Sequence, residues 1–176
     1  GYSQAIGSEV EVETDTVPAQ AMALPLPHAE TIEGNLYAKR CQTDLMRPSI
    51  HVHVEGFKDL KGNVRVQLYG EEPDQFLAKG AKLLRIEIPV PDDGAPVDIC
   101  VPLESKGVYA LFIMHDRNKN GKANVFSDGF GISNNPKMKL RKPRHDEAAF
   151  EVGDEVLDMN IELQYFGGNK KKRRAR

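Results

Sequence analysis

The residues with the clearest chemical potential lie in one stretch, HDRNKNGKANVFSDGFGISNNP, which occupies positions 115–136. Its first part places Asp116, Asn118 and Asn120 at alternate positions, directly before Gly121. This is the residue order of a Ca²⁺-binding loop, in which side-chain oxygens come from positions one, three and five and glycine stands at position six. The stretch is therefore a candidate cation site.

The remaining positions of the loop offer few further ligands. Position nine is Asn124, position twelve is Ser127 rather than Glu, and the next carboxylate, Asp128, comes one residue later. Two interpretations remain open. The first is a Ca²⁺ site, whose candidate ligands are Asp116, Asn118, Asn120, Asn124 and Asp128. The second is a tight loop ordered by Asx turns, with Gly121 at positive φ and no bound ion.

Positive charge surrounds these candidate ligands. Residues 115–145 contain eight Lys and Arg against two Asp, a net charge of +6. This charge repels a divalent ion, although salt screens the more exposed groups. It also predicts a surface that contacts an anionic partner. The basic residues concerned are Arg117, Lys119, Lys122, Lys137, Lys139, Arg141, Lys142 and Arg144.

The two ends of the chain carry opposite charges. Residues 1–38 hold six acidic side chains and no Lys or Arg, and residues 167–176 hold six basic ones. Near an anionic lipid surface each basic residue contributes about 1 kcal/mol, so the tail is expected to dock on lipid head groups or on an acidic protein. The acidic arm and a pI of about 6.2 argue against a nucleic-acid binder. The tail residues expected to make this contact are Lys170, Lys171, Lys172, Arg173 and Arg174.

Two histidines form another candidate site. His51 and His53 lie two residues apart on a predicted strand, so they share one face, and this spacing suits Zn or Cu. His115 would add a third ligand only if its strand were a neighbour. A solvated polar face is the simpler interpretation. The sequence has no nucleophile elbow, Walker motif or dinucleotide fingerprint, so we expect a non-enzyme without a cofactor, with Ca²⁺ in the 116–128 loop kept as the alternative.

Apolar residues alternate with polar ones along most of the chain after residue 48, which predicts strands. The predicted strands span 49–55, 62–69, 82–90, 95–101, 108–114, 148–152 and 156–165. Residues 108–114 are apolar on both faces, so this strand should be central, and a helical turn is expected over 76–81. Short strands with half-buried alternation predict an antiparallel, immunoglobulin-like β-sandwich. The expected organisation is an extended arm (1–40), the sandwich (41–166) and a basic tail (167–176).

The chain has two cysteines, Cys41 and Cys100. An even count fits a disulfide in an exported protein and two free thiols in a cytosolic one. If bridged, they would hold the incoming arm across the outer face of a sheet, because Cys100 lies on the face opposite Ile99 and Val101.

Residues 49–166 resemble the bacterial domain-of-unknown-function family numbered 2141. The motifs that carry the resemblance are GNVRVQLY, GVYALFIMHDRNKNG, DGFGISNNP and NIELQY, together with Lys-Pro and Glu-Ala-Ala-Phe between the last two. Many members have Asp where Asn124 stands here, which weakens the case for a cation. The resemblance implies a secreted or periplasmic β-sandwich of no established activity, and it supports the disulfide, since exported members often carry cysteines at comparable places.

These observations together predict how the protein works. Residue 1 is Gly rather than Met, so we expect a signal peptide to have been removed, and no apolar run approaches the roughly 20 residues of a membrane span. We expect a non-enzymatic accessory subunit of an envelope or membrane protein assembly, docking through its arm, its basic end-loop and its tail. The alternative is a free periplasmic module that binds calcium or an anionic glycan or lipid at residues 115–145.

Overall fold

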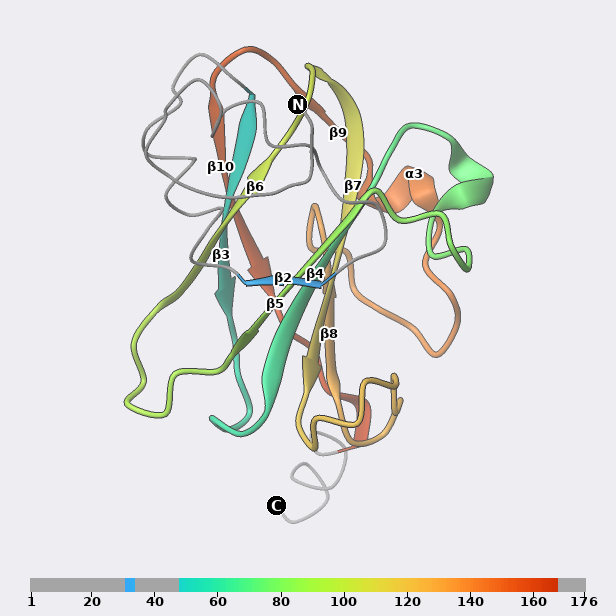
Figure 1. The fold of residues 1–176 in the computed structure, drawn as a ribbon. Coiled ribbons are helices and arrows are strands. Elements are labelled where there is room, and N and C mark those ends of the chain that lie inside the picture. The colour runs from blue at the N-terminus through green and yellow to red at the C-terminus, as the bar shows by residue number, and fades with distance from the viewer. Residues whose placement is uncertain (1–30, 34–47, 168–176) are drawn as a thin grey trace.

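The computed structural model describes residues 31–33 and 48–167, which form an all-β sandwich of two sheets (Figure 1). The smaller sheet has the strand order β10-β3-β6. The larger sheet has the order β2-β5-β4-β7-β8, and β9 also pairs with β7. The strands are β2 (Thr31–Glu33), β3 (Ser49–Glu55), β4 (Asn63–Tyr69), β5 (Leu84–Pro89), β6 (Val97–Pro102), β7 (Gly107–Asp116), β8 (Gly129–Ile132), β9 (Phe150–Val152) and β10 (Val156–Glu162).

All seven predicted strands are present, so the predicted sandwich is confirmed. The structure adds β8, which the sequence interpretation left inside a loop, and β2, which lies within the predicted arm and pairs with β5. The rest of the arm and the tail from residue 168 lie outside the described residues.

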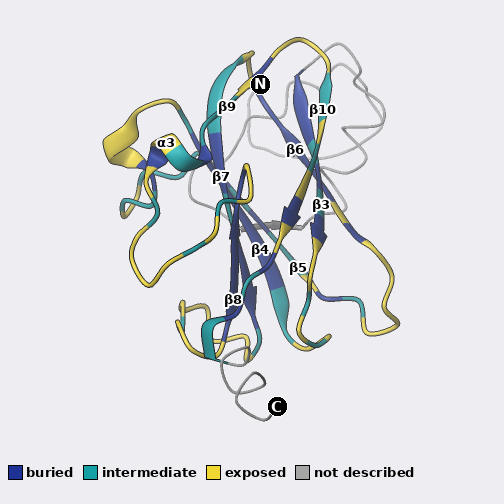
Figure 2. Ribbon diagram, turned by 180° about the vertical axis from the view of Figure 1, so that it is seen from behind, coloured by how far each residue is buried: buried dark blue, intermediate teal, exposed yellow. Residues whose placement is uncertain are grey.

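The core forms where the inward faces of the two sheets meet. Ile50 and Val52 on β3, Ile99 on β6, Val66 on β4 and Ile113 on β7 are each at most 1% exposed. Each such side chain contributes roughly 1.5–3 kcal/mol by leaving water. Figure 2 shows the central strands β4, β7 and β8 largely buried and most of the connecting loops exposed.

A second, smaller cluster covers the outer face of the larger sheet. Phe76 is 1% exposed and meets Tyr69 edge-on, with ring centroids 5.3 Å apart. The helical turn expected over 76–81 is misplaced. The 3₁₀ helix η1 (Pro73–Gln75) ends before Phe76, and Leu77 has a φ of 62°, which is incompatible with a right-handed helix. The short helix α3 (His145–Ala148) also packs here, through Ala148.

Two strand pairings differ from the antiparallel expectation. β10 pairs with β3 in parallel, with Asp158 opposite His51, and β2 pairs with β5 in parallel. The other pairs of named strands are antiparallel. The parallel pairing makes β3 the middle strand of the smaller sheet, between β10 and β6, and so fixes which side chains lie beside its two histidines.

Candidate functional site

The predicted cation loop joins β7 to β8 at the lower end of the sandwich in Figure 1. It begins at Asp116, the last residue of β7, whose side chain is 1% exposed. The Asp116 carboxylate accepts backbone hydrogen bonds from Asn120 at 3.3 Å and from Gly121 at 2.8 Å. Gly121 has a φ of 76°, the positive value expected from the sequence. The start of the loop is therefore closed around a buried carboxylate.

The loop ends on a second buried carboxylate. Asp128 is also 1% exposed and accepts backbone hydrogen bonds from Arg117 at 3.1 Å and from Asn124 at 2.9 Å. Hydrogen bonds to an ionised group are stronger than those between neutral groups, so two such carboxylates hold both ends of the loop firmly.

The asparagines between these two carboxylates also accept backbone hydrogen bonds within the loop. Asn118 Oδ1 accepts from the Asn120 amide at 3.2 Å, and Asn120 Oδ1 accepts from the Lys122 amide at 3.0 Å. The Asn120 Nδ2 group donates to Asn124 Oδ1 at 2.9 Å. The hydrogen bonds expected of Asx turns are therefore present. The Ca²⁺ site stays a prediction.

A buried polar network supports the loop from the adjoining end of β7. His115 is 0% exposed, and its Nε2 donates to the Lys61 carbonyl oxygen at 2.6 Å, which leaves Nδ1 to accept from the Tyr165 hydroxyl at 2.7 Å. The same hydroxyl accepts from the Lys58 amide at 3.0 Å. Burial lowers the pKa of His115 and raises the pKa of Tyr165 to about 12. Both groups therefore remain neutral at physiological pH.

Three arginines predicted to contact a partner already pair within the protein. The Arg117 Nε donates to Asp59 Oδ2 at 2.9 Å, and this hydrogen bond raises the pKa of Arg117 and lowers that of Asp59. Arg141 pairs with Glu147 at 3.1 Å. Arg144 pairs in the same way with Asp146 at 3.0 Å. These pairs reduce the positive charge that the segment presents.

The lysines of the segment are different. All five are exposed, and within residues 31–33 and 48–167 none of them makes an ion pair. They are Lys119, Lys122, Lys137, Lys139 and Lys142. The tail residues Lys170 to Arg174 lie outside the described residues, so their predicted contact stays a prediction.

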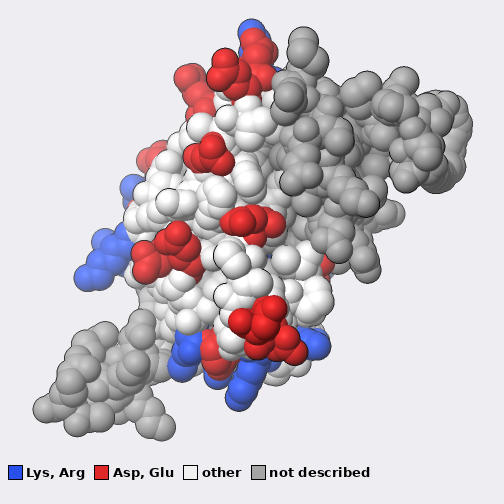
Figure 3. All heavy atoms as spheres, turned by 90° about the vertical axis from the view of Figure 1, so that its left-hand side faces the viewer, with Lys and Arg blue, Asp and Glu red and all other residues white. Residues whose placement is uncertain are grey.

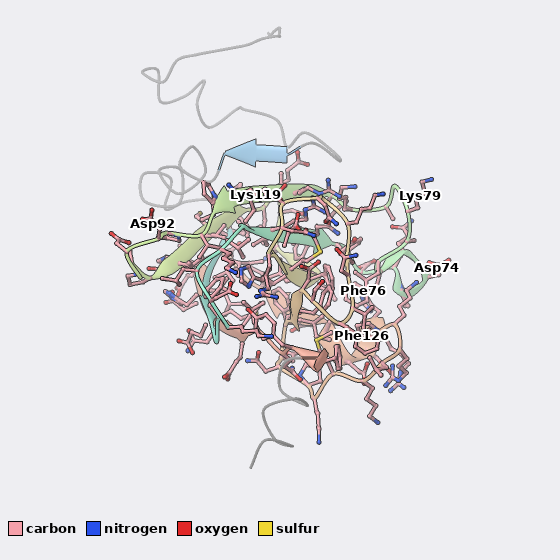
Figure 4. All side chains as sticks on the ribbon, turned by 90° about the horizontal axis from the view of Figure 1, so that it is seen from below. Asp74, Phe76, Lys79, Asp92, Lys119 and Phe126 are labelled. Atoms are coloured by element: carbon pink, nitrogen blue, oxygen red, sulfur yellow. The ribbon has the colours of Figure 1, made fainter. Side chains whose placement is uncertain are left out.

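Exposed apolar side chains accompany these lysines. Phe126 is 66% exposed, Leu140 64% and Val125 44%. The two loops that carry them approach the same C-terminal segment. The Met138 amide donates to Gln164 Oε1 at 3.0 Å, and a Cβ on Gly167 would lie 2.4 Å from the Phe126 carbonyl oxygen. Figure 4 looks onto this end from below, with Lys119 and Phe126 at separate places on it.

The end-loop lies within the part of the chain that matches a known family profile. A bacterial family described as "Uncharacterized protein conserved in bacteria (DUF2141)" matches residues 52–160, more than half of the chain. The chain belongs to the DUF2141 family. No curated protein and no solved structure matches the sequence.

The DUF2141 chain has one shallow pocket beside the lysines. It lies between residues 136–143 and Glu147 and holds about 190 Å³ of space, part of it open to solvent. Small-molecule sites usually span about 300–1,000 Å³. This pocket is therefore smaller than a usual small-molecule site.

The other predicted residues lie elsewhere in the fold. His51 and His53 are on β3 and His115 is on β7 in the other sheet, so the condition for His115 as a third ligand is not met. Cys100 lies on β6 opposite His51, whereas Cys41 is outside the described residues, so their disulfide stays a prediction. Among the described residues, no helix has the length and hydropathy of a membrane span.

Sequence reasoning missed Phe126 and Leu140. Each is a single large apolar residue within a polar, lysine-containing loop, and that contrast was the available signal. A single exposed apolar residue is ordinary on protein surfaces. Phe126 and Leu140 become informative only because the fold brings their two loops to the same C-terminal segment.

Proposed function

We propose that this DUF2141 protein is a non-enzymatic accessory module of the bacterial envelope that docks on anionic lipid head groups through its 115–145 end. One observation carries the proposal. Exposed Phe126 and Leu140 lie in two loops that also carry five exposed lysines without an ion-pair partner among the described residues. Apolar side chains that enter the interface, combined with Lys beside the phosphates, are the usual means of peripheral membrane attachment.

The arrangement of charge favours this end over others. The arginines are held by carboxylates, whereas the lysines are free to reach phosphates as flexible point charges. Gly167, the last described residue, lies against Phe126, and the basic tail follows it in the sequence. A periplasmic or secreted location and the Cys41–Cys100 disulfide are parts of the same proposal.

Vesicle sedimentation tests the proposal with the full chain. Binding is expected to vesicles containing anionic lipid and not to zwitterionic ones, and it should weaken steeply with salt. Phe126→Ser and the double variant Lys137→Gln/Lys139→Gln should each weaken binding at least threefold. The matched control is Lys79→Gln, an exposed lysine in another part of the surface, which should change nothing.

Two outcomes contradict the lipid proposal. One is equal binding to both kinds of vesicle, and the other is equal loss of binding in the Lys79→Gln control and the 137/139 double variant. Failure on vesicles together with capture of an acidic membrane protein complex by crosslinking from Lys137 or Lys139 would move the docking partner from lipid to protein.

A further inference from the structure

The outer face of the smaller sheet holds a pair of histidines in contact. His51 and His53 lie on β3, the middle strand, and alternate with Ile50 and Val52, which are fully buried in the core. Alternation along a strand sends both imidazoles to the same outer face. Their ring centroids are 4.5 Å apart, at an interplanar angle of 41°.

Each neighbouring strand brings one carboxylate to this pair. Asp98 on β6 is opposite His53, and Asp158 on β10 is opposite His51. Asp158 Oδ1 is 3.4 Å from His51 Nδ1 and 3.3 Å from His53 Nε2. On the other side of the ring, Asp98 Oδ1 is 2.5 Å from His53 Nδ1. A second set, His51, His53 and Asp98, also offers ligand atoms within 4.8 Å of one another, so the histidine pair has a carboxylate on each side.

We propose that His51, His53 and Asp158 bind a divalent transition-metal ion of the zinc class, with Asp98 orienting the His53 ring. In a tetrahedral zinc site with bonds of about 2.0–2.1 Å, the ligand atoms stand about 3.3–3.4 Å from one another. The distances from Asp158 Oδ1 to the two imidazole nitrogens have this length. A metal-bound histidine commonly gives its second ring nitrogen to a carboxylate, and Asp98 occupies that position.

The charge of the sheet favours a cation at this place. The three strands β3, β6 and β10 contain four carboxylates and neither Lys nor Arg. Figure 3 views the molecule from the side on which this sheet lies, and Asp and Glu are spread over it while most Lys and Arg lie toward the lower end. The carboxylates concerned are Glu55, Asp98, Asp158 and Glu162.

The ligand types select the class of metal. Two imidazole nitrogens favour Zn²⁺, Cu²⁺ or Ni²⁺, whereas Ca²⁺ and Mg²⁺ need mostly oxygen ligands. The side chains of His51 and His53 are 41% and 31% exposed, so an ion reaches them without movement of the core. Three protein ligands leave a fourth position for water. This site is separate from the predicted Ca²⁺ loop in both location and chemistry.

Calorimetric titration of the full chain with Zn²⁺ tests the proposal. The chain is expected to bind one equivalent of Zn²⁺, and its melting temperature should rise. Any heat measured on adding Ca²⁺ should be unchanged by substitution of His51 or His53. His53→Ala should weaken Zn²⁺ binding at least tenfold, and Asp158→Asn should weaken it about tenfold. Asp98→Asn should weaken Zn²⁺ binding roughly 10-fold, the lower limit of the 10–100-fold loss that is usual when a residue orienting a metal ligand is changed.

The matched control is Glu55→Gln. Glu55 is exposed at the end of the same strand, so this change removes the same charge from the same sheet but no ligand. It should alter the affinity less than about twofold. All these side chains lie on the outer face, so circular dichroism should show native structure in each variant.

The proposal is overturned if the full chain binds no Zn²⁺ at millimolar concentration. It is also overturned if a His51→Ala/His53→Ala double variant binds as tightly as the parent, because the ion would then lie elsewhere. Equal effects of Glu55→Gln and Asp158→Asn would reduce the site to general electrostatic attraction and would overturn it as well.

Discussion

Replacing Asp116 by Ala is expected to lower the free energy of unfolding by about 2–4 kcal/mol. The side chain is 1% exposed and accepts two backbone hydrogen bonds, from Asn120 and Gly121. A hydrogen bond to a charged group contributes about 1.5–3 kcal/mol. The two bonds would sum to about 3–6 kcal/mol. The expected loss is set below this sum because the bond from Asn120 is long at 3.3 Å and the loop lies next to solvent.

Thermal and urea unfolding of the parent and the variant measure this loss. For a domain of this size, 1 kcal/mol changes the melting temperature by roughly 3–4 °C, so a fall of about 6–15 °C is expected. Asn118→Ala is the matched control. Asn118 is exposed and also accepts from the Asn120 amide, so its loss should cost less than about 1 kcal/mol.

The calcium dependence of this result decides between the two interpretations of the loop. If Asp116 acts by closing the turn, the loss is the same with excess Ca²⁺ and with a chelator. A loss below about 1 kcal/mol in the chelator, together with a large stabilisation of the parent by Ca²⁺, would refute the reasoning and establish a Ca²⁺ site.

Three further predictions concern the network beneath the loop. Tyr165→Phe should cost about 1–3 kcal/mol in urea unfolding, because it leaves the Lys58 amide and His115 Nδ1 without their partner, and an unchanged midpoint would contradict this. Gly129→Ala should cost about 1–3 kcal/mol in the same assay, because the new Cβ would lie 2.4 Å from the Tyr165 ring, and wild-type stability would show that the ring moves freely. The contribution of neutral His115, whose pKa burial lowers from 6.5, should be complete above about pH 6.5 and should fall as the pH drops through its folded value. The measurement is the difference in free energy of unfolding between the parent and His115→Gln, taken at several pH values from 7 to 5. If this difference does not change with pH, protonation of His115 is not coupled to stability.

The missed strand β8 shows where sequence patterns stop being informative. Its sequence, Gly129-Phe130-Gly131-Ile132, contains two glycines, which usually indicate a turn. Both are needed because the C-terminal segment passes against this strand. A Cβ on Gly131 would lie 2.9 Å from the Glu162 carbonyl oxygen. The requirement arises from a contact between distant segments, so the local sequence carries the glycines but not their reason.

The histidine site was only half predictable for a related reason. Period-two alternation places His51 and His53 on one face of their strand, and this part of the prediction is confirmed. It does not say which strands lie on either side. The positions of Asp98 and Asp158 follow from the order and direction of pairing in the smaller sheet, including the parallel β10. By contrast, the Asx turns at Asp116 were predictable because their hydrogen bonds are local.

The parallel pairing of β10 with β3 also determines when the protein can fold. β3 is the first strand of the smaller sheet in the chain and β10 the last, so the sheet is incomplete until Glu162 is available. A chain truncated before Val156 lacks one whole edge of the sandwich. Such pairings over long sequence separations make folding slow, commonly in the range of milliseconds to seconds. The smaller sheet therefore closes last, when β10 pairs with β3 across more than one hundred residues of sequence.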